Sequence, residues 1–163
     1  MAATGPAMPQ PLSGTKEYEE AVDRVIDSAV CTVRVFDNIL SAGFNSAQRY
    51  AALRRLLLSS RRSALRIVVH EPRSLDRNCP RLLALLRQFG HLVQIHETHP
   101  AAKAVYDPFV IADERGYVRR FHFDQTPGTC AIEDPIGARA LIDRFEEIWE
   151  ASSPAVNATT LGL

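Results

Sequence analysis

The sequence lacks most of the short motifs by which catalytic and metal-binding sites are recognised. Its three cysteines are widely spaced, and no two of them have the two-residue separation of zinc and redox motifs. It contains neither a glycine-rich phosphate loop nor a Gly-x-Ser-x-Gly nucleophile elbow. These absences argue against a nucleotide site of the common kinds and against an acyl-transfer serine, and the sequence predicts no cofactor.

Other absences bear on location and domain limits. No apolar run approaches the roughly 20 residues that span a bilayer, and Met1–Gly14 lacks the basic and apolar regions of a signal peptide. An odd number of cysteines without a pairing pattern is typical of reduced thiols. We therefore predict a cytoplasmic protein with no membrane partner. Its ends at residues 1–15 and 153–163 are expected to be disordered, and residues 16–152 to form one domain.

Charge is balanced overall but uneven along the chain. Nineteen basic and nineteen acidic residues give a net charge of zero, so bulk charge favours neither nucleic acid nor a membrane surface. Residues 46–90 nevertheless hold ten arginines against only Glu71 and Asp76. This arginine-rich middle is the one compositional indication of an anionic partner. The alternative is that its arginines are solvated charges on the outer faces of helices.

Hydrophobic periodicity predicts alternating helices and strands. Helices are expected at residues 17–28, 46–59, 80–89 and 135–149, and strands at 29–36, 65–69, 92–95, 109–111, 117–124 and 129–132. The near-continuous apolar run at 65–69 is typical of a central strand that is covered on both faces. This alternation predicts an α/β fold, a layered α/β/α domain with a mixed, largely parallel sheet.

Capping residues indicate where the helices begin. Asn45 is expected to cap the helix at 46–59, with Gln48 as its reciprocal partner. Asp134, followed by Pro135, is expected to cap the last helix, whose buried side would start at Ile136.

Five polar residues are candidates for ligand binding: His70, Arg81, Arg120, His122 and Asp124. Arg120, His122 and Asp124 share one face of the strand at 117–124. There they either line a pocket or form the wet side of an edge strand, and the edge strand is the simpler interpretation. Arg81 begins a helix, where it would either hold an anion or pair with a nearby carboxylate.

The histidines do not predict a metal site. His96 and His99 have Glu97 between them, as metal ligands sometimes do. They lie at a strand end, however, where side chains alternate in direction and a three-residue separation does not bring them together. We expect ordinary surface or capping histidines and no bound metal.

Two segments resemble one catalytic-type domain of the phospholipase D superfamily. They are the strand and turn at Tyr106–Asp113 and the closing stretch at Asp134–Trp149, and the likeness extends over residues 17–151. Members of that superfamily carry His, any residue, Lys, four residues and Asp on this strand. The resemblance implies a histidine that attacks phosphorus, a lysine that binds the phosphate, and two such motifs facing each other across one site.

The superfamily motif is incomplete in this sequence. Asp113 occupies the aspartate position, but Tyr106 stands where the histidine would be and Pro108 where the lysine would be. A tyrosine with an ordinary pKa of about 10 is a poor nucleophile when that lysine is missing. The Gly-Ser-x-Asn segment of active members is also unmatched, since residues 128–131 read Gly-Thr-Cys-Ala. The resemblance therefore implies a degenerate member without an assigned catalytic residue.

A narrower resemblance is to a bacterial family of unknown function with this half-phospholipase fold. It rests on short segments such as Phe44–Ser46, Cys79–Leu82 and Phe145–Trp149. Some members of that family carry an acetyltransferase domain ahead of this one, so an acetyltransferase is expected as a separate protein partner of this 163-residue chain. A homodimer is also expected by analogy, because superfamily members build one site from two halves.

Three functional hypotheses result. The first, which we prefer, is a non-catalytic phospholipase D-like binding or regulatory module with an anion-receptive cleft near His70, Arg81 and Arg120. The second is a phosphodiesterase or nuclease with a non-standard catalytic set, drawn from His70, His91 or His122 across a homodimer interface. The third is anion or nucleic-acid binding through the arginine-rich middle, which predicts an affinity that falls steeply with added salt.

Overall fold

The computed structural model describes residues 8–105, 107–121 and 127–156. The strands within these ranges are β1 (Gln10–Leu12), β2 (Thr32–Asp37), β3 (Ala64–Val69), β4 (Val93–Thr98), β5 (Phe109–Ala112), β6 (Gly116–Arg120), β7 (Gly128–Ala131) and β8 (Ser152–Val156). The helices are α1 (Thr15–Ser28), α2 (Ala47–Ser59), α3 (Leu75–Asn78), α4 (Pro80–Gln88) and α5 (Pro135–Glu150), with 3-10 turns η1 (Ala42–Asn45) and η2 (Pro100–Ala104).

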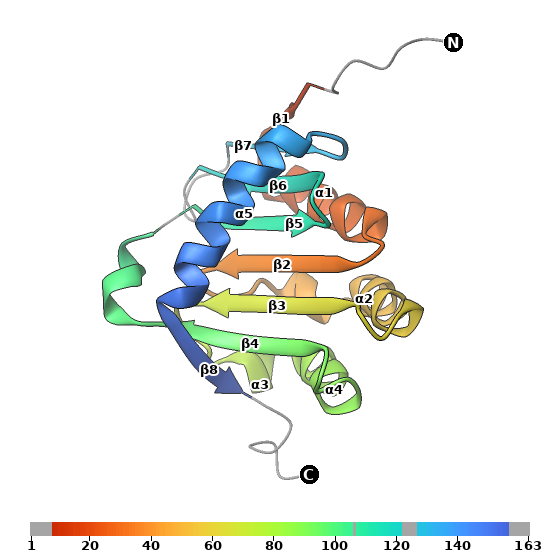
Figure 1. Cartoon of the computed structure of the whole chain (residues 1–163), viewed down its shortest axis with the longest axis vertical. Coiled ribbons are helices and arrows are strands. Elements are labelled where there is room, and N and C mark those ends of the chain that lie inside the picture. Colours follow the sequence, from red (N-terminus) through yellow and green to blue (C-terminus); the bar gives the residue numbers. More distant parts are fainter. Residues whose placement is uncertain (1–7, 106, 122–126, 157–163) are drawn as a thin grey trace.

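The strands of the described part form one mixed sheet with the order β1-β7-β6-β5-β2-β3-β4-β8 (Figure 1). Strands β2, β3 and β4 run parallel, and β3 is the covered central strand that its apolar sequence predicts. After β4 the chain returns through η2 to pair β5 antiparallel with β2. The α/β class and the mixed sheet are confirmed. Because the rest of the sheet grows by hairpins and edge pairing, parallel pairing is confined to β2, β3 and β4.

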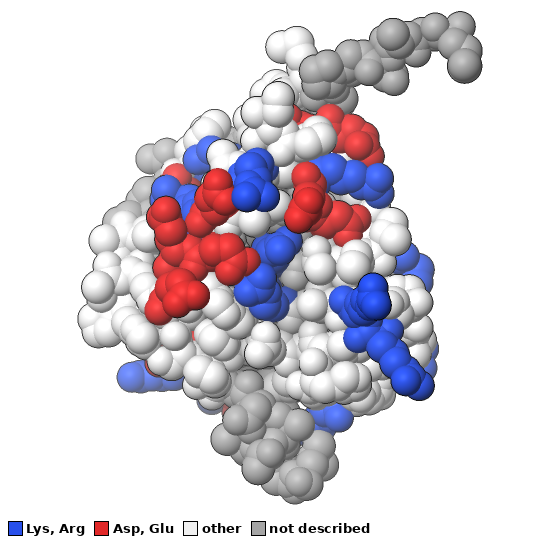
Figure 2. Space-filling model, in the orientation of Figure 1, with Lys and Arg blue, Asp and Glu red and all other residues white. Residues whose placement is uncertain are grey.

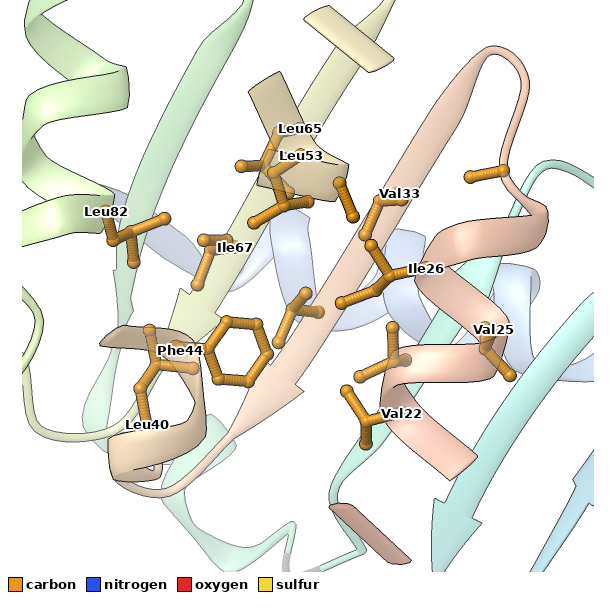
Figure 3. Packing of buried hydrophobic residues seen from close by; sticks show 14 of the residues in the cluster. Val22, Val25, Ile26, Val33, Leu40, Phe44, Leu53, Leu65, Ile67 and Leu82 are labelled. Carbon is orange, nitrogen blue, oxygen red and sulfur yellow. The ribbon is translucent and has the colours of Figure 1, made fainter. Parts of the chain in front are cut away.

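Helices cover both faces of the sheet. α1, α2 and α4 pack on one face, and α5 lies obliquely across the other (Figure 1). Figure 3 shows the larger core, in which Ile26 of α1, Leu53 of α2 and Leu82 of α4 point toward strand residues such as Ile67. Burying these aliphatic side chains is the main contribution to the stability of this layer.

The second core lies under α5. Phe145 is completely buried against Phe109, with ring centroids 6.4 Å apart in an edge-to-face arrangement. The Asp134 carboxylate accepts a hydrogen bond from the Gly137 N–H at 3.1 Å, so the predicted cap is confirmed. The prediction for Ile136 is wrong, because this side chain is 84% exposed on the first turn of α5, outside the buried stripe.

The cap of α2 differs from the prediction. Ser46, and not Asn45, caps this helix, since its hydroxyl oxygen accepts a hydrogen bond from the Arg49 N–H at 3.0 Å. Asn45 instead accepts a hydrogen bond from the Arg81 N–H at the start of α4, also at 3.0 Å. A long-range contact has replaced the local one, so Asn45 connects η1 with α4.

The edges of the sheet also differ from the prediction. Residues 10–12 and 152–156 were expected to lie in or next to disordered ends, but they form the edge strands β1 and β8. β6 is paired on both sides, with β5 and with β7, and is therefore not an edge strand. No helix in the described ranges is long and apolar enough to cross a membrane.

Candidate functional site

The motif aspartate has a structural task. Asp113 lies in the turn between β5 and β6, where it adopts the left-handed conformation with φ of 54° that aspartate tolerates better than most residues. Its carboxylate accepts hydrogen bonds from the backbone N–H groups of Val30 (3.0 Å), Cys31 (2.8 Å) and Thr32 (3.0 Å). Asp113 therefore holds the start of β2 against the β5–β6 turn.

Arg120 lies on the strand that pairs with Pro108, the residue that the sequence resemblance aligns with the superfamily lysine. Pro108 is buried directly before β5, and its carbonyl oxygen accepts a hydrogen bond from the backbone N–H of Arg120 at 2.9 Å. The Arg120 guanidinium carbon lies 5.3 Å from the centroid of the Tyr18 ring, on the side of the sheet that α1 covers. The strand that pairs with residue 108 thus supplies a positive charge next to the Tyr18 ring. Tyr106 lies outside the described residues.

Arg120 and Tyr18 line a pocket of about 220 Å³ at the carboxyl end of β2, which we call the β2 pocket. Its lining comes from four segments and consists of Tyr18, Glu19, Asp37, Asn38, Ile39, Ser41 and Arg120. The chain leaves β2 towards β3, while β5 occupies the other side of β2. Ligands of open α/β sheets commonly bind at such a point, outside the carboxyl ends of the strands.

Burial controls the protonation of the β2 pocket. It raises the pKa of Asp37 to about 7, and the Asn38 N–H and Arg120 offset only part of that rise. Burial also raises the pKa of Tyr18, so its phenol stays protonated and can donate a hydrogen bond. The Ser41 hydroxyl oxygen is buried and has no hydrogen-bond partner among the described residues. The pocket therefore combines hydroxyl donors and a cation with a carboxyl group that titrates near neutrality.

A buried arginine below the β2 pocket balances its second carboxylate. Arg49 is only 1% exposed, and it pairs with Glu19 at 2.9 Å and with Asp23 at 2.8 Å. Its guanidinium carbon also lies 4.6 Å from the centroid of the Phe44 ring. The sequence did not predict this role. The spacing of Arg49 from Leu53 and Leu56, four and seven residues away, was the only signal that it lies on the apolar face of α2.

His70 is held by hydrogen bonds on both ring nitrogens. Its Nε2 lies 2.7 Å from the Val105 carbonyl oxygen, and its Nδ1 lies 2.7 Å from the Thr98 hydroxyl. Because a carbonyl only accepts, Nε2 carries the hydrogen and Nδ1 accepts from Thr98. The buried imidazole is thus occupied as a structural link between β3, β4 and the segment after η2. It lines a separate cavity of about 100 Å³ together with Glu71, Glu97 and Lys103.

The predicted ligand-binding residues do not converge on one cleft. Arg81 is exposed at the start of α4 and donates a hydrogen bond to the Asn45 carbonyl at 2.6 Å. His70 packs edge-on against Phe36, in the core under α5 and across the sheet from α4. Of the predicted set, Arg120 alone among the described residues lines the β2 pocket. His122 and Asp124 lie outside the described residues.

The arginine-rich middle is divided between environments. Arg49 is buried, and Arg66 pairs with Glu146 of α5 at 2.7 Å on the opposite face of the sheet. Arg55 donates hydrogen bonds to backbone carbonyl groups at the end of α1. Figure 2 shows basic side chains over α2, where Arg54 is exposed, whereas basic and acidic side chains are mixed near α5.

The other described histidines either contact neighbouring side chains or lie away from the β2 pocket. His96 stacks on Trp149 with ring centroids 3.6 Å apart, and its Nδ1 lies 2.9 Å from the Ser152 hydroxyl. His99 Nε2 lies 2.5 Å from the Ser153 hydroxyl. His91 is exposed just before β4, at the end of the strands away from the β2 pocket. Within the described ranges, no three His, Cys, Asp or Glu residues are placed to hold a metal ion.

Solved structures share this fold. The archaeal chromatin protein TrmBL2, described as showing a novel mode of DNA binding, superposes with a TM-score of 0.67 at 11% identity over 91% of this chain and 55% of its own. Nuc from Salmonella typhimurium, a phospholipase D family member, superposes with a TM-score of 0.61 at 14% identity. The match covers 91% of this chain and 97% of Nuc. NucT from Helicobacter pylori superposes with a TM-score of 0.59 at 13% identity, and the match covers 91% of this chain and 99% of NucT. This chain therefore spans about half the length of TrmBL2 and nearly all of Nuc and NucT.

The shared architecture gives this chain an α/β fold like that of the phospholipase D family member Nuc. The chain belongs to the family described as domain of unknown function DUF7931, whose model matches residues 15–161. A search of curated proteins finds no sequence match. At identities of 11–14% the structural likeness establishes the fold alone.

Proposed function

We propose that this protein is a non-catalytic phospholipase D-like module that binds a phosphate ester in the β2 pocket without cleaving it. One observation carries the proposal. The backbone of Arg120 pairs with that of Pro108 and its side chain lines the β2 pocket, so a cation enters the pocket from the strand next to a motif that has tyrosine at the histidine position. Asp113 persists because it holds β2 in place, a task that is independent of phosphoryl chemistry.

The lining of the β2 pocket suits an anion better than a reaction. Arg120, the Tyr18 hydroxyl and the Ser41 hydroxyl are donors, and Glu19 is already paired with Arg49. Of the described residues, neither Tyr18 nor His70 is available as a nucleophile, since burial keeps the Tyr18 phenol protonated and both His70 nitrogens make hydrogen bonds. A donor set without an activated nucleophile supports binding and argues against phosphodiester cleavage.

The choice of a phosphate ester draws on the structural neighbours. TrmBL2 is described as binding DNA and Nuc as a phospholipase D family member, and phosphodiester groups are common to both descriptions. A pocket of about 220 Å³ has room for one such group and little more. The ligand would therefore insert a phosphate and leave its larger part outside.

Bis(p-nitrophenyl) phosphate tests both halves of the proposal, because it is a ligand candidate and a chromogenic substrate. We expect saturable binding by isothermal titration calorimetry and no release of p-nitrophenol above the buffer rate, with or without Mg²⁺. Hydrolysis by the wild-type protein that is lost in Arg120→Gln would overturn the non-catalytic function. Absence of measurable binding would overturn the binding function.

Matched arginine variants locate the bound phosphate. Arg120→Gln removes the charge of the β2 pocket and should weaken binding by about tenfold, the usual effect of losing a charge-assisted contact. Arg87→Gln removes an exposed arginine on α4 and should bind like the wild type. Equal binding by the two variants, with both melting like the wild type, would place the ligand elsewhere and contradict the assignment.

A further inference from the structure

A second cavity lies on the opposite face of the sheet from the β2 pocket. It is a groove of about 480 Å³ between α5, the strands β6 and β7 and Pro9 just before β1, and we call it the α5 groove. Tyr117, Arg119 and Phe121 line one wall, and Arg144 of α5 lines another. None of the residues that line the β2 pocket lines this groove, so a ligand of the α5 groove would be independent of the proposed function.

The groove is open because α5 presents small side chains to it. Gly137 and Ala140 occupy the turns of α5 that face the groove, next to Leu141. A Cβ atom at Gly137 would come within 2.7 Å of the Tyr117 hydroxyl oxygen, so only glycine allows this approach of helix and strand. Tyr117 in turn donates a hydrogen bond to the Asp134 carboxylate at 2.7 Å, which fixes the wall.

Two guanidinium groups in the groove share one carboxylate. Arg119 and Arg144 each approach the same oxygen atom of Asp107, at 3.3 and 3.7 Å. These three groups together carry one net positive charge. The Nε atoms of both arginines are buried and have no hydrogen-bond partner among the described residues. The pair therefore retains a net positive charge that can attract an anion with several oxygen atoms.

An aromatic surface adjoins the two arginines. Phe121 is 49% exposed, which is high for a ring of this size, and the Arg119 guanidinium carbon lies 5.3 Å from its centroid. One side of the ring is thus stabilised by a cation. An exposed phenyl ring beside paired guanidinium groups provides a surface on which a flat ring can stack while an attached phosphate is bound.

We propose that the α5 groove binds a phosphate monoester that carries a flat aromatic group, such as a nucleoside monophosphate. Arg119 and Arg144 would contact the phosphate, and its dianion would exceed the single net positive charge of the groove by only one. Phe121 would stack on the aromatic group. The volume of about 480 Å³ lies within the range of small-molecule sites, about 300–1,000 Å³.

Calorimetric titration of the full chain can separate phosphate binding from aromatic stacking. The ligands are adenosine 5′-monophosphate, adenosine and inorganic phosphate. We expect the monophosphate to bind at least about tenfold more tightly than either half, because both contacts act together. Equal affinities for the monophosphate and for inorganic phosphate would overturn the aromatic part of the proposal. If adenosine binds as tightly as the monophosphate, the phosphate part of the proposal would be overturned.

Variants assign the binding to the α5 groove. Arg144→Gln should weaken monophosphate binding by about tenfold, whereas Arg139→Gln, an exposed arginine on the same helix, should leave it unchanged. Phe121→Ala should weaken the binding of the monophosphate but not that of inorganic phosphate. If Arg144→Gln does not fold, Arg144→Lys, which keeps the charge, replaces it in the titration. Wild-type affinity for the monophosphate in the folded Arg144 variants would overturn the proposal.

Discussion

At the scale of single residues, Asp113 joins two parts of the sheet that are distant in the sequence. Three backbone N–H groups at the start of β2 depend on one carboxylate, and the left-handed backbone of the β5–β6 turn places it there. The contacts join segments more than 80 residues apart in the sequence, at separations of 81–83. A carboxylate in this position stabilises the sheet whether or not a nucleophile is present.

Asp113→Ala should therefore destabilise the fold with no effect specific to a ligand. Losing hydrogen bonds to a charged acceptor, partly replaced by water, should lower the free energy of unfolding by about 2 kcal/mol in urea denaturation. Asp143→Ala removes an exposed aspartate of α5 that pairs with Arg139 and should stay within about 0.5 kcal/mol of the wild type. Similar losses in both variants would show that Asp113 does not hold β2.

Asp37 makes stability depend on pH in a definite direction. Its folded pKa of about 7 lies above the ordinary value of 3.8, so the folded state binds the proton more tightly than the unfolded chain. The stabilisation from this proton is complete below pH 3.8 and is lost as pH rises to about 7. Tyr18, Glu19 and Arg120 are the charged or titratable groups that act on it from α1 and β6.

Asp37→Asn should remove that dependence. Relative to the wild type, the asparagine variant should gain stability between pH 4 and 8, on the order of a few kcal/mol. The difference between the two unfolding free energies, measured by urea denaturation at several pH values, should rise with pH and level off above about 7. A difference that stays flat across this range would refute the raised pKa of Asp37.

Arg49 contrasts with the exposed arginines of the same helix. Its guanidinium is buried between Glu19, Asp23 and the Phe44 ring, so truncation leaves two carboxylates facing each other without their cation. Arg49→Ala should cost about 3 kcal/mol of unfolding free energy, and Arg54→Ala, exposed on α2, less than about 0.5 kcal/mol. Chemical denaturation of both variants decides between a buried ion pair and a solvated charge.

At the scale of elements, the end of α5 is joined to the sheet by stacked side chains. The Trp149 indole lies on the His96 ring of β4, and the Arg66 guanidinium carbon of β3 lies 4.9 Å from the indole centroid. The Ser152 hydroxyl at the start of β8 completes the contact with His96. Burial, together with Arg66, lowers the pKa of His96 below its ordinary 6.5. The imidazole is therefore neutral at pH 7, and its contribution to stability is lost as pH falls below about 6.5.

Trp149 is the only tryptophan of the sequence and reports on this junction. Because an imidazolium stacked on indole quenches its emission, fluorescence should fall on acidification with a midpoint below 6.5. His96→Gln should remove the transition, and His91→Gln, at an exposed site, should retain it. A transition that persists in His96→Gln, or has its midpoint above 6.5, would contradict the stacked arrangement.

At the scale of the whole molecule, elements with local signals could be predicted and those that depend on tertiary pairing could not. Asp134 with Pro135 marked the start of α5, and an apolar run marked β3, because each signal lies within a few residues of the element. The edge strands β1 and β8 have little strand propensity and gain their order from pairing with β7 and β4.

The β2 pocket was only partly predictable for the same reason. Arg120 could be identified from strand alternation, whereas Tyr18, Asp37 and Ser41 come from three other segments. Nothing in the sequence around Asp37 distinguishes it from an ordinary aspartate at the end of a strand. Its raised pKa arises from burial, which is fixed only when α1 and the end of β6 close over the carboxyl end of β2.

Both free edges of the sheet carry a proline, which bears on self-association. Pro11 occupies the middle of β1, and Pro154 lies in β8 opposite His96 of β4. Proline has no N–H group to offer another strand, so each edge resists edge-to-edge pairing with a second chain. The homodimer predicted by analogy would therefore have to use another surface.

Replacing the edge proline should make the sheet associate. Pro154→Val restores an N–H group and strand propensity at the outer edge of β8, so its weight-average mass in sedimentation equilibrium should rise above that of the wild type at equal concentration. Pro100→Ala changes an exposed proline of η2 and should leave the mass unchanged. If Pro154→Val and the wild type have the same mass across the concentration range, proline does not protect this edge. Protection would then have to come from the shortness of β8 and the register shift between Ile95 and His96 where it pairs with β4.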